Sequence, residues 1–149
     1  MAEAVIQPAK APWHLWAVGI LSLLWDAVGA MDFTMTQTRN EAYMKAFTPE
    51  QLAYFYGFPL WAVVAWGTAT WSGLAGSVLL LLRKRLAFPV YLVSLAGMVL
   101  TTIYSVGLSE GLKVMGGGVG MVVFNAIIYV TGLLLLLYAR AMRKRGVLR

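Results

Sequence analysis

The chain has 149 residues, of which 60% are hydrophobic and only 12% are charged. Too little polar surface remains to cover a water-soluble globule of this size, and a mean hydropathy of +0.74 is typical of an integral membrane protein. The absence of cysteine excludes disulfides, thiolate nucleophiles and cysteine-ligated metals. The formal charge of +6 comes largely from lysines and arginines that flank apolar stretches, a pattern of membrane topology rather than of nucleic-acid binding.

Four apolar stretches are long enough to cross a bilayer as helices: residues 13–32, 59–82, 86–108 and 117–138. They predict an all-α polytopic membrane protein with a single four-helix transmembrane domain over residues 1–149. Small and polar residues recur at alternating three and four spacing along each stretch, which favours a left-handed bundle with helix crossings near ~20°. The principal partner of such a chain is the lipid bilayer.

Lysines and arginines in the short flanking segments predict the orientation. Nine of them lie on the side that holds both termini and the loop at residues 83–85, against three on the opposite side. Because the more basic side of a membrane protein faces the cytoplasm, we expect both termini to be cytoplasmic. The loop at 83–85 is so short that the second and third helices must be antiparallel neighbours.

The first outer loop, residues 33–58, carries the clearest signal for structure outside the four stretches. Thr48-Pro49-Glu50-Gln51 has the pattern of a capping box with proline at the first helical position, which predicts a short interfacial helix. Residues 40–47 are expected to form another helical turn or two. The aromatic side chains of this loop suit the headgroup boundary, as a simple interfacial cover or as a lid or interface over a binding site; they are Tyr43, Phe47, Tyr54, Phe55 and Tyr56.

Asp26 lies well inside the first apolar stretch, on the side of the helix that carries small residues, so it points into protein. A carboxyl group at that depth needs a partner, a water-filled pocket or a proton. Counting ~1.5 Å per residue from the expected helix ends, Asp26, Thr101 and Asn125 all lie roughly 9 to 12 Å below the outer surface. We therefore expect a polar cluster in the outer half of the bundle, with these further candidates: Ser22, Thr68, Tyr104 and Tyr129.

The Asp26 cluster has three open interpretations: a lock that holds four helices in register, a site for a ligand or a coupled proton, or a contact with a partner subunit. No nucleophile and base pair, metal-ligand set or cofactor motif is visible in the spans, so we expect no catalysis, no cofactor and no metal. The sequence therefore indicates an accessory subunit of a larger membrane complex or a small binding bundle. The alternative is a homo-oligomeric carrier of a small polar solute, sugar-like or proton-coupled, that uses the Asp26 layer.

Two runs carry a resemblance to a known family: residues 25–33, which read WDAVGAMDF, and residues 35–51, which begin MTQTRNEAYM and end FTPEQ. They resemble a family of small, uncharacterised proteobacterial inner-membrane proteins whose members are often labelled sugar transporters. The resemblance covers nearly the whole chain. It implies four helices in a bacterial inner membrane, and it implies no activity and no catalytic residue.

Overall fold

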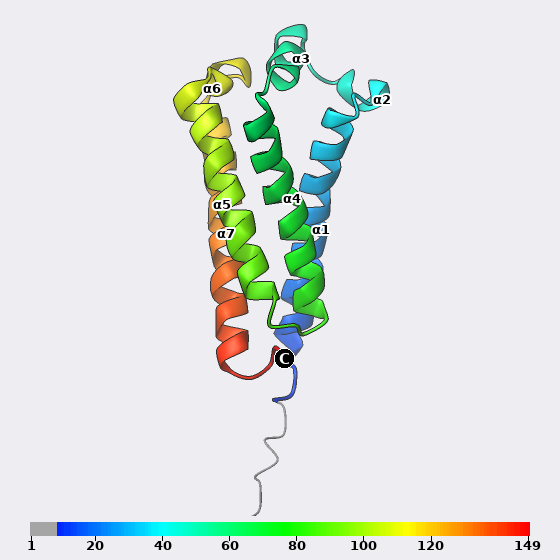
Figure 1. Ribbon diagram of the computed structural model, residues 1–149, viewed down its shortest axis with the longest axis vertical. Coiled ribbons are helices and arrows are strands. Elements are labelled where there is room, and N and C mark those ends of the chain that lie inside the picture. The colour runs from blue at the N-terminus through cyan, green and yellow to red at the C-terminus, as the bar shows by residue number, and fades with distance from the viewer. Residues whose placement is uncertain (1–8) are drawn as a thin grey trace, which may run out of the picture.

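The computed structural model describes residues 9–149, and this part of the chain is built from helices connected by turns. Four helical runs are long and apolar enough to span a membrane: α1 (Trp13–Gln37), α4 (Leu60–Leu81), α5 (Ala87–Thr102) with its π-helical continuation η1 (Ile103–Leu108), and α7 (Val119–Lys144). Three short helices lie at one end of the bundle, α2 (Glu41–Met44), α3 (Pro49–Tyr56) and α6 (Gly111–Val114) (Figure 1). The prediction of an all-α four-helix membrane bundle is confirmed.

The two ends of the bundle differ in chemistry. We call the end with α2, α3 and α6 the capped end, and the opposite end, where the α4–α5 turn and the end of α7 carry lysines and arginines, the basic end (Figure 1). At the basic end the backbone amide of Arg149 donates to the carbonyl of Arg83 at 2.7 Å, and the amide of Arg85 donates to the carbonyl of Arg149 at 2.9 Å. These bonds fasten residues 147–149 against the α4–α5 turn.

Close helix packing relies on glycines that face a neighbouring helix. α4 lies between α1 and α5, and α7 packs against α5. A Cβ atom added at Gly97 of α5 would lie only 2.8 Å from the carbonyl oxygen of Ala65 and from the amide nitrogen of Ala69 on α4. The backbones of α4 and α5 are therefore in direct contact along the small-residue stripe of α4, as in close helix pairs of other membrane proteins. This stripe consists of Ala62, Ala65, Ala69, Ser72 and Gly76.

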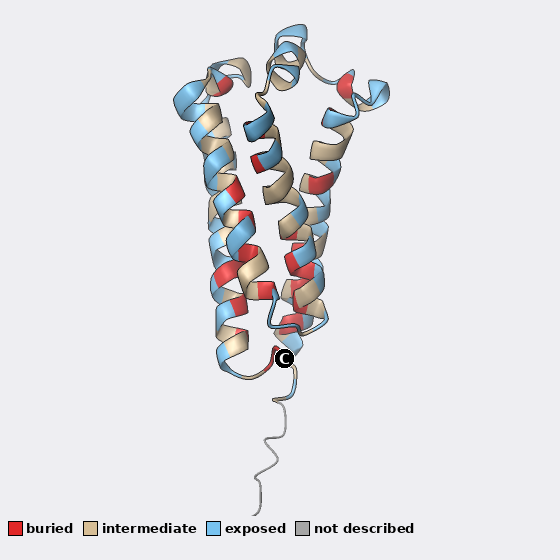
Figure 2. Ribbon diagram, in the orientation of Figure 1, coloured by how far each residue is buried: buried red, intermediate tan, exposed pale blue. Residues whose placement is uncertain are grey.

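The half of the bundle near the basic end is densely packed. Its buried apolar cluster is formed by α1, α4, α5, α7 and the segment after α7, and its members Leu15, Leu80 and Ala139 are all 0% exposed. Buried residues are sparser near the capped end (Figure 2). The bundle is therefore solid at one end and loosely filled at the other.

The apolar side chains on the outside of α7 show where lipid meets the protein. Val119 is 80% exposed and Leu134 60% exposed, although both lie on a helix apolar enough to span a membrane. An apolar surface that continues along a helix of this length is typical of contact with the hydrocarbon of a bilayer. The bundle therefore contacts the bilayer directly.

Two helices extend several residues beyond their predicted ends. α1 continues to Gln37, five residues beyond the predicted end at residue 32, so the loop that follows it is shorter than predicted. The added turn contains Thr34 and Thr36, whose hydroxyls donate to the carbonyls of Ala30 and Asp32 at 2.7 Å, and these polar side chains stay within the helix. α7 likewise continues to Lys144, six residues beyond the predicted end at residue 138.

The predicted interfacial helix is confirmed as α3. The side chain of Thr48 accepts from the amide of Gln51 at 3.2 Å, and the amide of Thr48 donates to the side chain of Gln51 at 3.1 Å. This reciprocal pair is the capping box expected from the sequence. The expected extra turn before it is α2, whose first amides are capped by Asn40.

Candidate ligand cavity

A cavity of about 570 Å³ lies in the loosely packed half of the bundle, next to the capped end. All four membrane-spanning runs contribute to its wall, and residues of the α2–α3 segment and of α6 complete it. Its volume falls within the range of roughly 300 to 1,000 Å³ found for small-molecule sites. The wall is mostly apolar and aromatic, with a few carboxyl, hydroxyl and amide groups, which is the usual composition of such a site.

Asp26 forms part of the floor of the cavity. Ser77 of α4 donates to Asp26 Oδ2 at 2.5 Å, and the hydroxyl of Tyr91 on α5 lies 2.8 Å from Ser77 Oγ. Ser22 lies 3.0 Å from Ser77 and donates to the carbonyl of Gly19 at 3.0 Å. Because a serine hydroxyl has a single proton, its donation to Asp26 leaves Ser77 to accept from Tyr91. The floor is thus a connected polar group shared by three helices.

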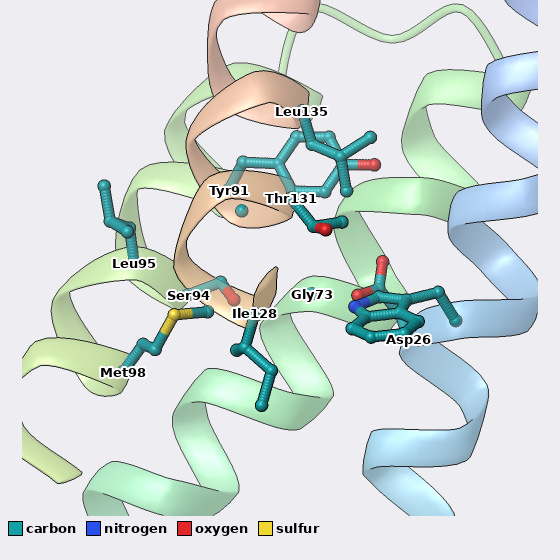
Figure 3. Close-up of a pocket in the computed structure, with 11 residues that line it drawn as sticks. Asp26, Gly73, Tyr91, Ser94, Leu95, Met98, Ile128, Thr131 and Leu135 are labelled. Atoms are coloured by element: carbon teal, nitrogen blue, oxygen red, sulfur yellow. The ribbon is translucent and has the colours of Figure 1, made fainter. Parts of the chain in front are cut away.

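Gly73 makes room for this arrangement. A Cβ atom at this position would lie 3.1 Å from Asp26 Oδ1 and 3.3 Å from Ser94 Oγ, so a larger residue would crowd both oxygens. Asp26 and Ser94 also border a second, small cavity of about 30 Å³ that reaches Thr131 of α7 (Figure 3). That volume is enough for a water molecule.

The predicted direct cluster of Asp26, Thr101 and Asn125 is wrong in its hydrogen bonds. Thr101 Oγ1 donates to the carbonyl of Gly97 at 2.8 Å, and Asn125 Nδ2 donates to the carbonyl of Met121 at 3.0 Å, so each bonds within its own helix. All three side chains nevertheless line the large cavity, as Tyr129 also does. The candidates share a cavity rather than a hydrogen-bonded layer.

The error comes from the length of α1. Asp26 lies eleven residues before the end of α1 at Gln37, so it is about 16 Å below that end rather than about 9 Å. The packing of α4 agrees with this depth, because Gly73 faces Asp26. Thr101 lies seven residues beyond Ser94 on α5, which places it about 10 Å nearer the capped end than the floor.

The remaining polar candidates are divided between the floor and the periphery. Ser22 belongs to the buried floor group, and Tyr129 donates to Thr102 Oγ1 at 2.7 Å in the α5–α7 wall. Tyr104 lies behind the wall, where its ring packs on Phe58 at 4.7 Å between ring centroids. Thr68 is half-buried and lies outside the cavity lining.

Aromatic side chains form the cover at the capped end. Tyr43, Phe47, Tyr54 and Phe55 all line the cavity, and the rings of Phe47 and Phe55 meet edge to face with centroids 5.5 Å apart. Tyr54 also bonds to Ser109 Oγ at 3.0 Å. All four belong to the aromatic residues for which the sequence left two interpretations open, a simple interfacial cover or a lid over a binding site.

Tyr56, the fifth aromatic residue of this set, lies outside the cavity lining. It is 37% exposed, and the guanidinium of Arg39 lies 4.3 Å from the centroid of its ring. Residues two apart on a helix point about 200° apart, so Tyr56 faces away from Tyr54, which lines the cavity.

A second acid, Asp32, lines the cavity nearer the cover. The hydroxyl of Tyr43 donates to Asp32 Oδ1 and links α2 to the last turns of α1. Partial burial, together with the neighbouring carboxylate, raises the pKa of Tyr43 to about 12. The phenol therefore stays protonated at neutral pH and holds the cover to α1.

Sequence reasoning missed Ser77, Gly73 and Asp32 as parts of the site. Ser77 directly follows Gly76 of the small-residue stripe on α4, but the stripe alone does not reveal which residue of α1 it faces. Asp32 lies at the predicted end of the first helix, where the membrane surface makes an acid unexceptional. Six residues turn a helix by about 600°, so Asp32 lies about 120° around α1 from Asp26, and helical periodicity gave no signal that both face one cavity.

The cavity is closed toward the basic end. Below the floor group lies the buried apolar cluster with Leu15, Leu80 and Leu135. His14 Nδ1 and the hydroxyl of Tyr138 are 2.5 Å apart and join α1 to α7 at that end.

Comparison of the chain with protein-family models, with curated proteins and with solved structures finds no match.

Proposed function

We propose that this protein is a non-catalytic binding bundle of the membrane that holds one small amphipathic molecule in the large cavity. The observation that carries the proposal is the cavity itself, about 570 Å³ in volume and walled by all four membrane-spanning runs. A structural lock needs no such volume, because a buried void costs stability through lost packing contacts. A bundle that is solid at one end and hollow at the other is better suited to binding.

The floor group supports the same proposal. Asp26 has a structural partner in Ser77, so part of its role is to hold α1 against α4. Its other oxygen, Oδ1, has no hydrogen-bond partner within residues 9–149. A carboxyl oxygen at the floor of an otherwise apolar cavity is a fixed point to which a polar group of a ligand can bind.

A carrier of a small polar solute is the second candidate, and it needs more than the observed conformation. The floor and the buried apolar cluster separate the cavity from the basic end by several helical turns. Transport would require these side chains to part in a second conformation. Binding requires no such change, and the role of accessory subunit in a larger complex is compatible with it.

We also propose that the capped end faces the periplasm of a bacterial inner membrane and that both termini are cytoplasmic. The orientation is supported by the distribution of charge, nine basic residues on the terminal side against three on the other. The choice of a bacterial inner membrane is supported by the resemblance carried by residues 25–33 and 35–51. A ligand would then enter from the periplasm or from the outer leaflet. A fluorescent reporter that is active only in the cytoplasm is fused to the C-terminus. We expect it to fluoresce if this orientation is right.

Equilibrium dialysis of the protein in lipid nanodiscs tests the binding function. Three probes share a phenylbutyl body and differ in the head group: phenylbutyltrimethylammonium, phenylbutanol and phenylbutyrate. We expect at least one of them to bind saturably with one site per chain, after subtraction of uptake by empty nanodiscs. Failure of all three to bind to folded protein would refute the proposed function.

A pair of glycine substitutions locates the binding. Gly29 lines the cavity, and a Cβ atom there would meet only Thr70 Cγ2 at 3.8 Å, so Gly29→Leu fills the cavity without a backbone clash. Gly120 is the matched control, because it lies on α7 with open space around it and outside the lining. We expect Gly29→Leu to abolish saturable binding and Gly120→Leu to retain it.

A further inference from the structure

We infer that the ligand of the large cavity is an organic cation with an apolar body, an inference that rests on the proposed binding function and names its ligand class. Two carboxyl groups, those of Asp26 and Asp32, face the cavity. No lysine, arginine or histidine of residues 9–149 lines it. The cavity therefore offers negative charge without an opposing positive charge.

The cations at the capped end are positioned away from the cavity. Lys113 pairs with Glu110 at 2.8 Å on the exposed surface of α6. Arg39 lies over the ring of Tyr56, and Lys45 is exposed after α2. Each of these side chains lies outside the cavity lining, so a cationic ligand would meet no like charge there.

The two acids are placed for two different contacts. Asp26 is at the floor with Oδ1 available, whereas Asp32 is near the cover and already accepts from Tyr43. Six residues of helix separate them, a rise of about 9 Å along α1. Asp26 is therefore the principal charge partner of a cation at the floor, and Asp32 guides the cation past the cover.

The aromatic wall fits the same class of ligand. Trp66 is half-buried in the wall, its ring stacks on Phe55 with centroids 6.1 Å apart, and it meets Phe33 edge to face at 5.1 Å. Trp25 of α1 stands directly before Asp26 and lines both cavities. Faces of tryptophan, tyrosine and phenylalanine attract organic cations, and they also cover an apolar body.

The three phenylbutyl probes test the inference on the unmodified protein, because they differ in charge and share the body. We expect the trimethylammonium probe to bind at least about tenfold more tightly than the alcohol, and the carboxylate probe to bind most weakly. Equal binding of the alcohol and the cation, or tighter binding of the carboxylate, would overturn the inference. Either result would leave the proposed binding function standing, since a probe would still occupy the cavity.

Isosteric variants identify the charge partner. Asp26→Asn is expected to weaken the trimethylammonium probe by about tenfold or more and to leave the alcohol unchanged. Asp32→Asn is expected to weaken the same probe less, and Glu50→Gln, an exposed position on α3 outside the lining, is the matched control with no effect. An unchanged affinity in both aspartate variants, each folded by circular dichroism, would also overturn the inference.

Discussion

Replacing Gly97 by alanine should separate α4 from α5 and loosen the wall of the cavity. The added Cβ atom would lie 2.8 Å from the carbonyl oxygen of Ala65 and from the amide nitrogen of Ala69, whereas ordinary contact begins at 3.4 Å. Both obstacles are backbone atoms that cannot rotate away, so the helices must part by several tenths of an ångström. The bond from Ser94 Oγ to the carbonyl of Ala69, now 2.6 Å, spans the same seam and would stretch.

We expect Gly97→Ala to lower the free energy of unfolding by about 1 to 3 kcal/mol, the usual cost of overpacking. Gly107→Ala is the matched control on the same membrane-spanning run, because its Cβ atom would meet nothing within 4 Å. Unfolding both variants with sodium dodecyl sulfate in mixed micelles, followed by circular dichroism, measures the difference. A Gly97→Ala protein as stable as Gly107→Ala would refute the direct contact between the α4 and α5 backbones.

Three further predictions concern packing, the cover and the surface. Leu80 is 0% exposed, so Leu80→Ala should lower the free energy of unfolding by about 2 to 5 kcal/mol. Leu60→Ala on the same helix, where the side chain is 79% exposed, should lower it far less. Equal losses in the same unfolding assay would contradict the dense packing near the basic end. The phenol of Tyr43 should titrate near pH 12 in the ultraviolet difference spectrum between wild type and Tyr43→Phe. Because its pKa is raised above the ordinary 10.0, its contribution to stability should be present below pH 10 and fall between pH 10 and 12. A titration midpoint at the ordinary pKa would argue against the bond to Asp32. Glu110→Gln should leave the unfolding midpoint unchanged, since its ion pair is fully exposed to solvent, and a clear shift would show that this pair contributes to the fold.

The fold class, the number of membrane-spanning helices and the capping box of α3 were predictable because they depend on short stretches of sequence. The length of each apolar run sets the spans, and Thr48 with Gln51 specifies the start of α3 through contacts only three residues apart. The inward direction of Asp26 also followed from helical periodicity alone. These features need no knowledge of how one helix sits against another.

The contacts between helices were not predictable, because they depend on register. Ending the first helix at residue 32 rather than at Gln37 placed Asp26 too close to the capped end, and this single error paired it with Thr101 and Asn125 instead of Ser77. Small residues on α4 predict that a backbone comes close, but they do not fix the relative height of the helices. The cavity was hidden for the same reason, since its volume depends on the spacing of four helices at once.

Reactivity of a single cysteine at position 125 tests the central claim, a cavity beneath the cover of the capped end, most directly. The native chain has no cysteine, so Asn125→Cys provides one reactive thiol in the cavity wall, and Leu80→Cys provides the buried control. We predict that a membrane-impermeant thiol reagent labels the first variant rapidly and the second hardly at all, and that the tightest phenylbutyl probe slows the first reaction. Equally slow labelling of both variants, or labelling of Asn125→Cys that no probe slows, would contradict the account.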